Sequence, residues 1–334
     1  MALLLQNDVT AQNGKVTDTT VTGYDSLKSQ YAVVTYLHIM AKVYTIHQEV
    51  LVADTCGISF MCSTAHNYIF ANVVLVADDQ QTLLARIMKI LRDGTEYGAM
   101  MHFVPLPQAC TVENTCPVVY LLHGYGGNAR SWVGLKPELP KIADEKGIIF
   151  VCPDGKNSWY WDSPVDSSSR YETYISQELT DYIDKNYRSI ASPKGRAITG
   201  YSMGGHGALW LAFRHPDLYG AAGSMSGGVD IRPFPHSWHM KDYLGSYEKN
   251  PEIWEQHTVI NQLPYKAPTG QLALIIDCGS SDFFYEVNQR LHEKLLYYRI
   301  PHDYIIRPGS HTFSYWKNAI EYQLLYFNKY FKSL

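Results

Sequence analysis

A serine between two glycines, in the segment GYSMG at residues 200–204, is the first feature of this sequence that could do chemistry. The G-x-S-x-G pattern is weak by itself, because a chain of this length contains one by chance about 10% of the time. It becomes specific where a strand precedes the serine and a helix follows it, since the sharp turn between them exposes the hydroxyl. Here RAITG predicts a strand, and GHGALWLAFRHP predicts a helix that ends before Pro216. We therefore predict that Ser202 is a nucleophile rather than a structural turn residue.

A serine hydroxyl is a weak nucleophile at neutral pH, so it needs a base to take its proton and a carboxylate to orient that base. The loop GSHTFSYW follows the predicted strand HDYIIRP and contains His311, which we expect to be the base rather than a surface histidine. The loop CGSSDFFY follows the predicted strand QLALIID and contains Asp282. We expect Asp282 to be the acid, because a loop carboxylate can turn toward the histidine. Asp277 is the alternative but lies within the strand, and Asp303 opens the last strand at the wrong end of the sheet.

The glycine-rich segment HGYGG, residues 123–127, directly follows the predicted strand PVVYLL. When a serine attacks a carbonyl carbon, the oxygen becomes an oxyanion. Backbone N–H groups from the residue after the nucleophile and from such a loop stabilise it. We expect the amides of Met203 and Tyr125 to be these donors, and Gly124 to contact the substrate. The loop also fits a dinucleotide fingerprint, G-x-G-x-x-A. The segment after it carries prolines and lacks an acidic partner for a ribose, so we expect no organic cofactor.

Two further segments hold residues that could bind a ligand. PHSWHMKDY contains His236 and His239, but no additional set of Cys, His or Asp accompanies them, so we expect a solvated loop and no metal. NSWYWDSPVDSSSRYETY follows the predicted strand that ends in PDG, which places it over the serine. Its Trp159, Tyr160 and Trp161 either stack on a sugar or aryl group or pack in the core. Under the first alternative, Trp159 and Trp161 are the expected substrate contacts.

From about residue 117 onward, predicted strands and helices alternate along the chain. The apolar strand segments are PVVYLLHG, GIIFVCPDG, GRAITGY, GAAGSMSGG, QLALIIDCG and HDYIIRPG. Helical spacing of apolar residues marks YETYISQELTDYIDKNY, GHGALWLAFRHP, YEVNQRLHEKLLYYR and FSYWKNAIEYQLLYF. Strands that are apolar along their whole length and alternate with helices indicate a mainly parallel α/β sheet, covered by helices on both faces. Ligands bind at the carboxyl ends of such strands, where the loops described above lie.

The beginning of the chain lacks this alternation and carries no motif that indicates a function. NDVTAQNGKVTDTTVTGYDSLKS is polar, whereas YAVVTYLHIMAKVYTIHQEVLVA and NYIFANVVLVADD are rich in β-branched and aromatic residues, which predicts strands. LLARIMKILRDGTEYGAMMHFVPLP predicts a β-hairpin with its turn at Asp93-Gly94. We therefore divide the chain into a partly β N-terminal segment, residues 1–83, and a catalytic domain, residues 84–334.

The composition excludes several classes of partner. A formal net charge of −4 and the lack of a Lys/Arg cluster with interleaved aromatics argue against nucleic acid. No apolar run is long enough to span a membrane. The six cysteines form no C-x-x-C motif, although Cys110 could pair with Cys116, and Cys56 with Cys62. The first residues, MALLLQNDVTAQ, match the end of an export signal, which favours a secreted or periplasmic location; a plain cytosolic start is the alternative.

Taken together, these segments resemble the esterase D family of α/β-hydrolases. The matching pieces occur in order over about residues 84–334 and are YLLHGYGGNARSW, FVCPDG, YETYISQELTDYID, GYSMGGHGALWLAFRHPDLYGAAGSMSGG, IDCGSSDFFY and PGSHTFSYW. The resemblance implies an α/β-hydrolase fold and the same nucleophile, base, acid and oxyanion donors that the residues themselves indicate. The first 80 or so residues depart from the family, whose members usually open with a short strand pair.

This family includes carbohydrate esterases that remove acetyl or feruloyl groups from xylan, tributyrin-type esterases, S-formylglutathione hydrolases and mycolyltransferases of the antigen 85 type. The resemblance therefore implies a serine ester hydrolase that works through an acyl-enzyme without a cofactor. SMSGGVDI and the aromatic loop at residues 159–161 are closer to the carbohydrate and tributyrin branches. We expect feruloyl or acetyl groups on plant polysaccharide as substrates. The alternatives are S-formylglutathione hydrolysis, acyl transfer to a sugar, or, in another class, a non-catalytic carbohydrate-binding module.

Overall fold

The chain divides into two compact units, Met1–Arg86 and Ile87–Leu334. The structure is a computed structural model. It describes residues 104–107, 110, 114–263 and 272–333 in full, and before residue 104 only the backbone of the strands. No helix in these described ranges is both long enough and apolar enough to cross a membrane.

Short parallel strands make up the described part of the N-terminal unit. One sheet pairs β1 with β3, and the other has the order β2-β4-β5. The strands are β1 (Ala2–Leu4), β2 (Lys15–Val16), β3 (Thr20–Thr22), β4 (Ala32–Val34) and β5 (Val50–Val52). Both β4 and β5 lie in the first apolar run that we predict to form strands. The second run, NYIFANVVLVADD, lies outside the described residues, as do Cys56 and Cys62.

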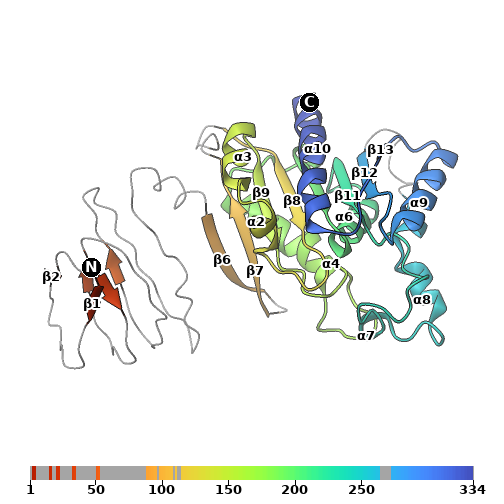
Figure 1. Cartoon of the computed structure of the whole chain (residues 1–334), viewed down its shortest axis with the longest axis horizontal. Coiled ribbons are helices and arrows are strands. Elements are labelled where there is room, and N and C mark those ends of the chain that lie inside the picture. The colour runs from red at the N-terminus through yellow and green to blue at the C-terminus, as the bar shows by residue number, and fades with distance from the viewer. Residues whose placement is uncertain are drawn as a thin grey trace. The chain divides into compact units, whose positions relative to one another are not determined.

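A mainly parallel sheet is the centre of the C-terminal unit (Figure 1). Its order over the described strands is β13-β12-β11-β10-β8-β9-β7-β6. The strands from β8 to β13 pair in parallel, whereas β7 and β6 join antiparallel at one edge. The strands are β6 (Met88–Thr95), β7 (Gly98–Pro105), β8 (Val118–Leu122), β9 (Ile149–Pro153), β10 (Arg196–Gly200), β11 (Ala221–Met225), β12 (Ala273–Gly279) and β13 (Asp303–Arg307). The predicted parallel sheet is therefore confirmed.

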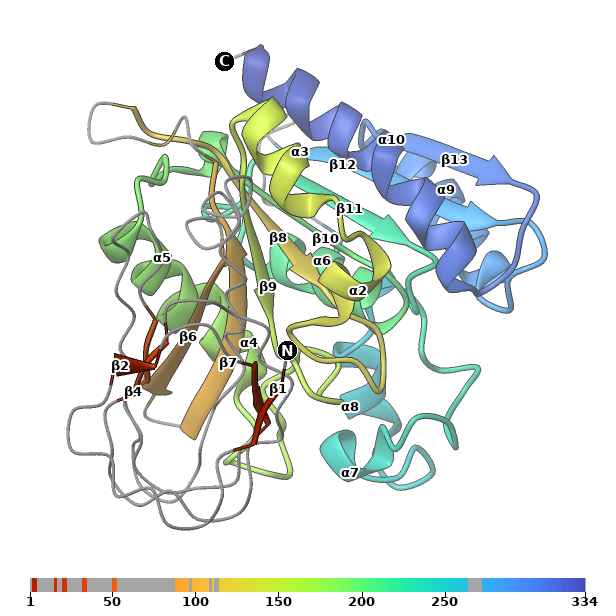
Figure 2. The ribbon, with the colours of Figure 1, turned by 60° about the vertical axis from the view of Figure 1, so that its left-hand side comes forward.

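Helices cover both faces of this sheet (Figure 2). The α-helices are α2 (Ser131–Leu135), α3 (Leu139–Lys146), α4 (Tyr171–Thr173), α5 (Thr180–Asn186), α6 (Met203–Arg214), α7 (Lys241–Leu244), α8 (Pro251–Gln256), α9 (Tyr285–Tyr297) and α10 (Phe313–Lys332). The side chains of α2, α3 and α10 pack on the face that includes Val119 and Leu121. Those of α5, α6 and α9 pack on the opposite face, with Tyr120 and Leu122. Successive strand residues point to opposite faces, so a strand covered on both sides is apolar throughout.

The segment that we predict as one helix, YETYISQELTDYIDKNY, has a π-helical turn between α4 and α5. This turn, η1, spans Tyr174–Leu179. The Thr180 hydroxyl donates a hydrogen bond of 3.0 Å to the carbonyl of Ile175 in this turn. Two short 3₁₀ turns complete the described helical elements: η2 (Pro193–Gly195) and η3 (Val259–Asn261).

The predicted hairpin of β6 and β7 is present, but its turn is not at Asp93-Gly94. Both residues lie inside β6, where Asp93 pairs with Met100 and Gly94 with Ala99. Pairing continues to Thr95, opposite Gly98. The two remaining residues form the connection, and two residues are the most common length for a hairpin loop. The Asp-Gly pair is tolerated inside β6 because this is the edge strand of the sheet.

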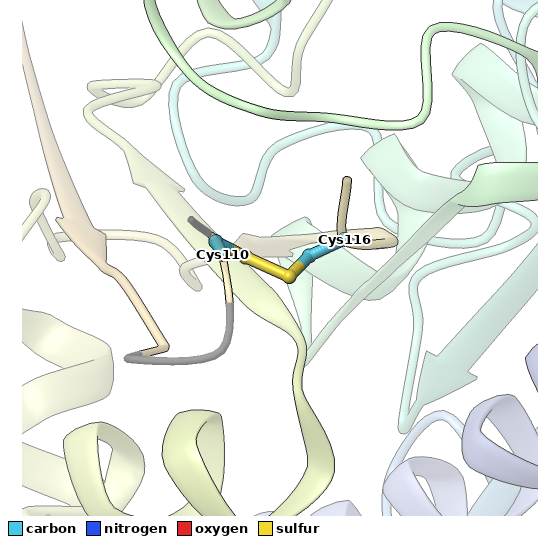
Figure 3. Close-up of a disulfide and its surroundings, with 2 residues drawn as sticks. All are labelled: Cys110 and Cys116. Carbon is cyan, nitrogen blue, oxygen red and sulfur yellow. A yellow bond between two sulfur atoms is a disulfide. The ribbon is translucent and has the colours of Figure 1, made fainter. Parts of the chain in front are cut away.

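A disulfide joins Cys110 to Cys116 just before β8 (Figure 3). The Cα atoms of the two residues are 5.7 Å apart, within the range that a disulfide spans. Cys116 also takes part in an isolated bridge with Ser189, and its N–H donates to the Arg188 carbonyl. The disulfide and these backbone contacts therefore hold Cys116 in place directly before β8, the first parallel strand in the chain. Among the other described cysteines, Cys152 and Cys278 are buried free thiols.

Candidate active site

The turn between β10 and α6 carries Ser202 in an unusual backbone conformation. Its φ and ψ are 56° and −121°, a region that non-glycine residues rarely adopt. The Ser202 N–H donates to the Met225 carbonyl of β11 at 2.9 Å, which holds the turn against the sheet. A Cβ atom added to Gly200 would collide with the Gly204 carbonyl, and one added to Gly204 would collide with the Leu122 carbonyl. Only glycine therefore fits two residues before and two residues after the serine.

A chain of hydrogen bonds connects Ser202 to His311 and Asp282. The Ser202 Oγ atom lies 2.8 Å from His311 Nε2. The other ring nitrogen, Nδ1, lies 3.0 and 2.9 Å from the two carboxylate oxygens of Asp282. The Asp282 carboxylate accepts a proton on Nδ1, and this tautomer leaves the Nε2 lone pair free to accept the serine hydroxyl. The structure thus brings the predicted nucleophile, base and acid together from three loops.

Aromatic rings hold the His311 imidazole on several sides. Its ring centroid lies 4.2 Å from that of Phe283, 4.7 Å from that of Trp316 and 5.4 Å from that of Phe284. The His311 side chain is 15% exposed, and that of Asp282 is fully buried. Edge-to-face and tilted ring contacts are favourable arrangements that fix the orientation of a ring. The imidazole is therefore positioned by packing as well as by its two hydrogen bonds.

Asp277, the alternative acid, has other partners. The Tyr315 hydroxyl donates to its Oδ1 at 2.5 Å, and Arg307 pairs with its Oδ2. Burial raises the pKa of Asp277, although Tyr315 and Arg307 act in the opposite direction. Asp277 thus links β12 to β13 and α10, which is a structural role.

The amides of Tyr125 and Met203 lie on the two segments that meet at Ser202. The amide of Gly126 donates to Asn157 Oδ1 at 2.7 Å, and the amide of Gly127 donates to the Gly124 carbonyl at 3.0 Å. Among the described residues, by contrast, the amides of Tyr125 and Met203 have no hydrogen-bond acceptor. A backbone N–H without a partner at the mouth of a site is available to an oxyanion.

Gly124 is buried against the turn that carries the serine. A Cβ atom on Gly124 would lie 2.6 Å from the Tyr201 ring and 3.3 Å from the Cβ atom of Ser202. This glycine therefore allows the segment of Tyr125 to approach the serine closely. A substrate contact by Gly124 itself stays a prediction.

Trp159 and Trp161 do not overhang the serine as an open aromatic surface. Their exposed fractions are 1% and 0%. Both rings pack edge-to-face on His206, and Trp159 also contacts Trp238. A ring must expose a face to stack on a sugar or aryl group. The expectation of substrate contacts is corrected here, and the alternative of core packing fits the structure.

Phe283 and Trp238 lie near the site and were not predicted from the sequence, whereas His239 was considered only as a metal ligand. Phe283 has a 51% exposed side chain, and its ring stacks with Trp238 at a centroid distance of 5.8 Å. His239 Nδ1 lies 3.3 Å from the Tyr125 hydroxyl. Phe283 directly follows the predicted acid in SSDFFY, and that adjacency was a usable signal. The segment PHSWHMKDY was considered for a metal, and its sequence did not indicate a contact of Trp238 or His239 with the site.

No group of three or more His, Cys, Asp and Glu side chains within the described residues could hold a metal ion. His236 is 80% exposed and lies 3.7 Å from Glu248, whereas its neighbour His239 points to Tyr125. The two histidines of PHSWHMKDY thus have separate partners.

Comparison with known proteins shows the family to which this chain belongs. A family model described as "Putative esterase" matches residues 96–327. Esterase Rv1288 of Mycobacterium tuberculosis is 28% identical over 232 residues, which cover 61% of this chain and 50% of that protein. The S-formylglutathione hydrolase of Bos taurus is 25% identical over 225 residues, which cover 61% and 78%. The chain spans about half the length of the first curated relatives that it matches.

Solved structures show the same fold. A ferulic acid esterase superposes with a TM-score of 0.61 and 26% identity, over 73% of this chain and 98% of that chain. FphF of Staphylococcus aureus, a fluorophosphonate-binding serine hydrolase, superposes with a TM-score of 0.64 and 21% identity, over 72% and 98%. The predicted α/β-hydrolase fold and the resemblance to this group of esterases are both confirmed.

Proposed function

The chain belongs to the esterase family, and we propose that it is a serine carboxylic-ester hydrolase that forms an acyl-enzyme. The observation that carries the proposal is the hydrogen-bond chain from Ser202 through His311 to Asp282. In this proposal Ser202 is the nucleophile, His311 the general base and Asp282 the residue that orients the imidazole. The strained turn at Ser202 and its flanking glycines support the same assignment.

In the first half of the reaction, Ser202 Oγ attacks the acyl carbonyl carbon while its proton moves to His311 Nε2. Asp282 stabilises the imidazolium that forms, because its carboxylate accepts the Nδ1 proton. The carbonyl oxygen becomes an oxyanion, and the Tyr125 and Met203 amides donate hydrogen bonds to it. The C–O bond to the alcohol then breaks, and the alcohol leaves with the proton from His311.

In the second half, a water molecule replaces the alcohol. His311 Nε2 takes a proton from this water as its oxygen attacks the acyl carbon of the acyl-enzyme. Collapse of the second tetrahedral intermediate returns the proton to Ser202 and releases the acid. Each step is accounted for by side chains and amides of this chain, so we propose that the reaction needs no metal or organic cofactor.

For the substrate, we propose feruloyl or acetyl esters of plant polysaccharide. The exposed ring of Phe283 beside His311, stacked on Trp238, supports an aromatic acyl group. The similarity to a solved ferulic acid esterase points the same way. S-formylglutathione hydrolysis is the second candidate, supported by the hydrolase of Bos taurus. A sugar acyltransferase of the same fold would form more transfer product than hydrolysis product when acceptor sugar is added, whereas a hydrolase would form mainly the free acid.

The test is hydrolysis of p-nitrophenyl acetate, methyl ferulate and S-formylglutathione by the wild type, Ser202→Ala and Ser226→Ala. Ser226 is a matched control, because it is buried and also has a positive φ, 50°. We expect Ser202→Ala to lose roughly 10³-fold or more in kcat, and Ser226→Ala to stay active. The preferred substrate then identifies the branch. If wild type and Ser202→Ala have equal rates and a fluorophosphonate probe does not label Ser202, the chain is a binding module instead.

A further inference from the structure

The segment that follows β9 contacts the loop that carries the Tyr125 amide. Asn157 Oδ1 accepts the Gly126 N–H at 2.7 Å, which is a short and well-formed hydrogen bond for this pair of groups. Gly126 has a φ of 76°, so the chain turns sharply directly after Tyr125. Peptide groups are planar, and the Gly126 N–H belongs to the same plane as the Tyr125 carbonyl. Asn157 therefore fixes the peptide group that follows the Tyr125 amide.

The preceding peptide group is held as well. Its carbonyl, that of Gly124, accepts a bond of 3.0 Å from the Gly127 N–H and one of 2.8 Å from the His123 ring. In a trans peptide the C=O and the N–H point in opposite directions, so an anchored Gly124 carbonyl aims the Tyr125 N–H the other way. The Tyr125 amide thus lies between two anchored peptide groups, and Asn157 is the side chain that anchors the second.

The backbone turn that carries Asn157 is held by hydrogen bonds of its neighbours. Gly155 N–H donates to His123 Nε2 at 2.9 Å, and the Ser158 hydroxyl donates to the Gly155 carbonyl at 2.6 Å. Lys156 has a φ of 48° and its N–H donates to Asp154 at 3.0 Å, which closes the turn just before Asn157. Because this turn is held, the Asn157 side chain on it can keep the Gly126 amide, and the loop that contains it, in one position.

We propose that Asn157 is a positioning residue that places the Tyr125 amide for the oxyanion. This inference rests on the proposed ester hydrolysis. Asn157 itself touches neither the serine nor the developing charge and acts through the Gly126 amide. Because the oxyanion exists only in the tetrahedral state, misplacing its donor slows the chemical step more than it weakens substrate binding.

The experiment compares Asn157→Ala with Asn128→Ala on p-nitrophenyl acetate. Asn128 is the matched control, because its Oδ1 accepts the Arg130 N–H at 2.8 Å on the outer part of the same loop. We expect Asn157→Ala to lower kcat about 10- to 100-fold with KM changed less than about 3-fold. The control variant is expected to keep both constants within about 2-fold.

A second readout separates positioning from general damage. A trifluoromethyl ketone forms an anionic tetrahedral adduct with an active serine, whereas the acid product binds without one. In Asn157→Ala the inhibition constant of the ketone is expected to rise by the same factor by which kcat/KM falls, and that of the product to stay unchanged. If Asn157→Ala does not fold, Asn157→Ser carries the same comparison. A folded Asn157 variant with wild-type kcat and ketone affinity overturns the proposal, whereas equal rates for wild type and Ser202→Ala overturn the proposed function.

Discussion

The Phe283 ring lies 4.2 Å from the His311 imidazole, measured between ring centroids, and is tilted by 36° to it. Half of the Phe283 side chain is exposed. Under the proposed function, we expect an aromatic acyl group on Ser202 to contact this ring, and aromatic pairs contribute about 0.5–1.5 kcal/mol beyond area burial.

We therefore expect Phe283→Ala to reduce kcat/KM for methyl ferulate about 2- to 10-fold relative to p-nitrophenyl acetate. Any loss of activity from a less firmly held His311 imidazole affects both substrates equally, so it cancels in the ratio of their kcat/KM values. Phe313→Ala is the control, since its ring is 62% exposed but packs on Tyr201 and Trp316. An unchanged ferulate-to-acetate ratio in Phe283→Ala would remove the structural support for an aromatic acyl group.

The two buried aspartates of β12 and its loop are expected to respond differently to substitution. Asp282→Asn leaves the shape intact but can no longer hold the required His311 tautomer, so kcat is expected to fall about 10³-fold or more. Asp277→Asn instead weakens the contacts with Tyr315 and Arg307, so the loss is expected in thermal stability. Steady-state kinetics and thermal unfolding of both variants measure this difference. A larger loss of kcat in Asp277→Asn would reverse the two roles.

Gly204, two residues after the serine, is not expected to tolerate a methyl group. In Gly204→Ala the new Cβ would collide with the Leu122 and His123 carbonyls of the backbone, which cannot move without shifting the sheet. We expect a loss of roughly 3 kcal/mol or more, or no folded protein. Gly134→Ala is the control, because it lies in α2 with open space around it and is expected to gain about 0.5–1 kcal/mol. Urea unfolding measures both.

His206 is expected to make stability depend on pH. Burial lowers its pKa from 6.5 to about 3, although the Gly228 carbonyl that accepts its Nδ1 proton acts in the opposite direction. Between these values the unfolded chain binds one more proton than the folded chain. Stability from this group is therefore present above pH 6.5 and is lost as the pH falls toward 3, by about 1.4 kcal/mol per pH unit.

The measurement is urea unfolding from pH 4 to 7.5 of the wild type and of His206→Phe, which keeps a ring among Trp159, Trp161 and Trp210. The slope of the unfolding free energy against pH is expected to be smaller in the variant by about one proton. His236→Gln, at a side chain that is 80% exposed, is the control. Equal slopes for wild type and His206→Phe would show that folding does not lower the pKa of His206.

Several features of the site were predictable from local sequence. The strand-to-helix turn around Ser202 is visible because RAITG predicts a strand, GHGALWLAFRHP predicts a helix, and glycines lie two residues before and two residues after the serine between them. The loops that hold Asp282 and His311 were predictable for a topological reason, since carboxyl ends of parallel strands meet at one edge of the sheet. The choice between Asp277 and Asp282 followed from their positions inside and after a strand.

The sequence by itself determined the order of the parallel strands after residue 117, because strands covered on both faces are apolar along most of their length. It did not predict the short helices α2, α3, α7 and α8. Only the tertiary structure decided which aromatic rings are buried and which are exposed. Trp159 is covered by His206 and Trp238, whereas Phe283 keeps half of its surface open. Likewise, the bond from Gly126 to Asn157 forms between two loops that follow neighbouring strands. Such contacts depend on how distant segments pack, and an aromatic or amide side chain has the same local sequence pattern whether or not another segment covers it.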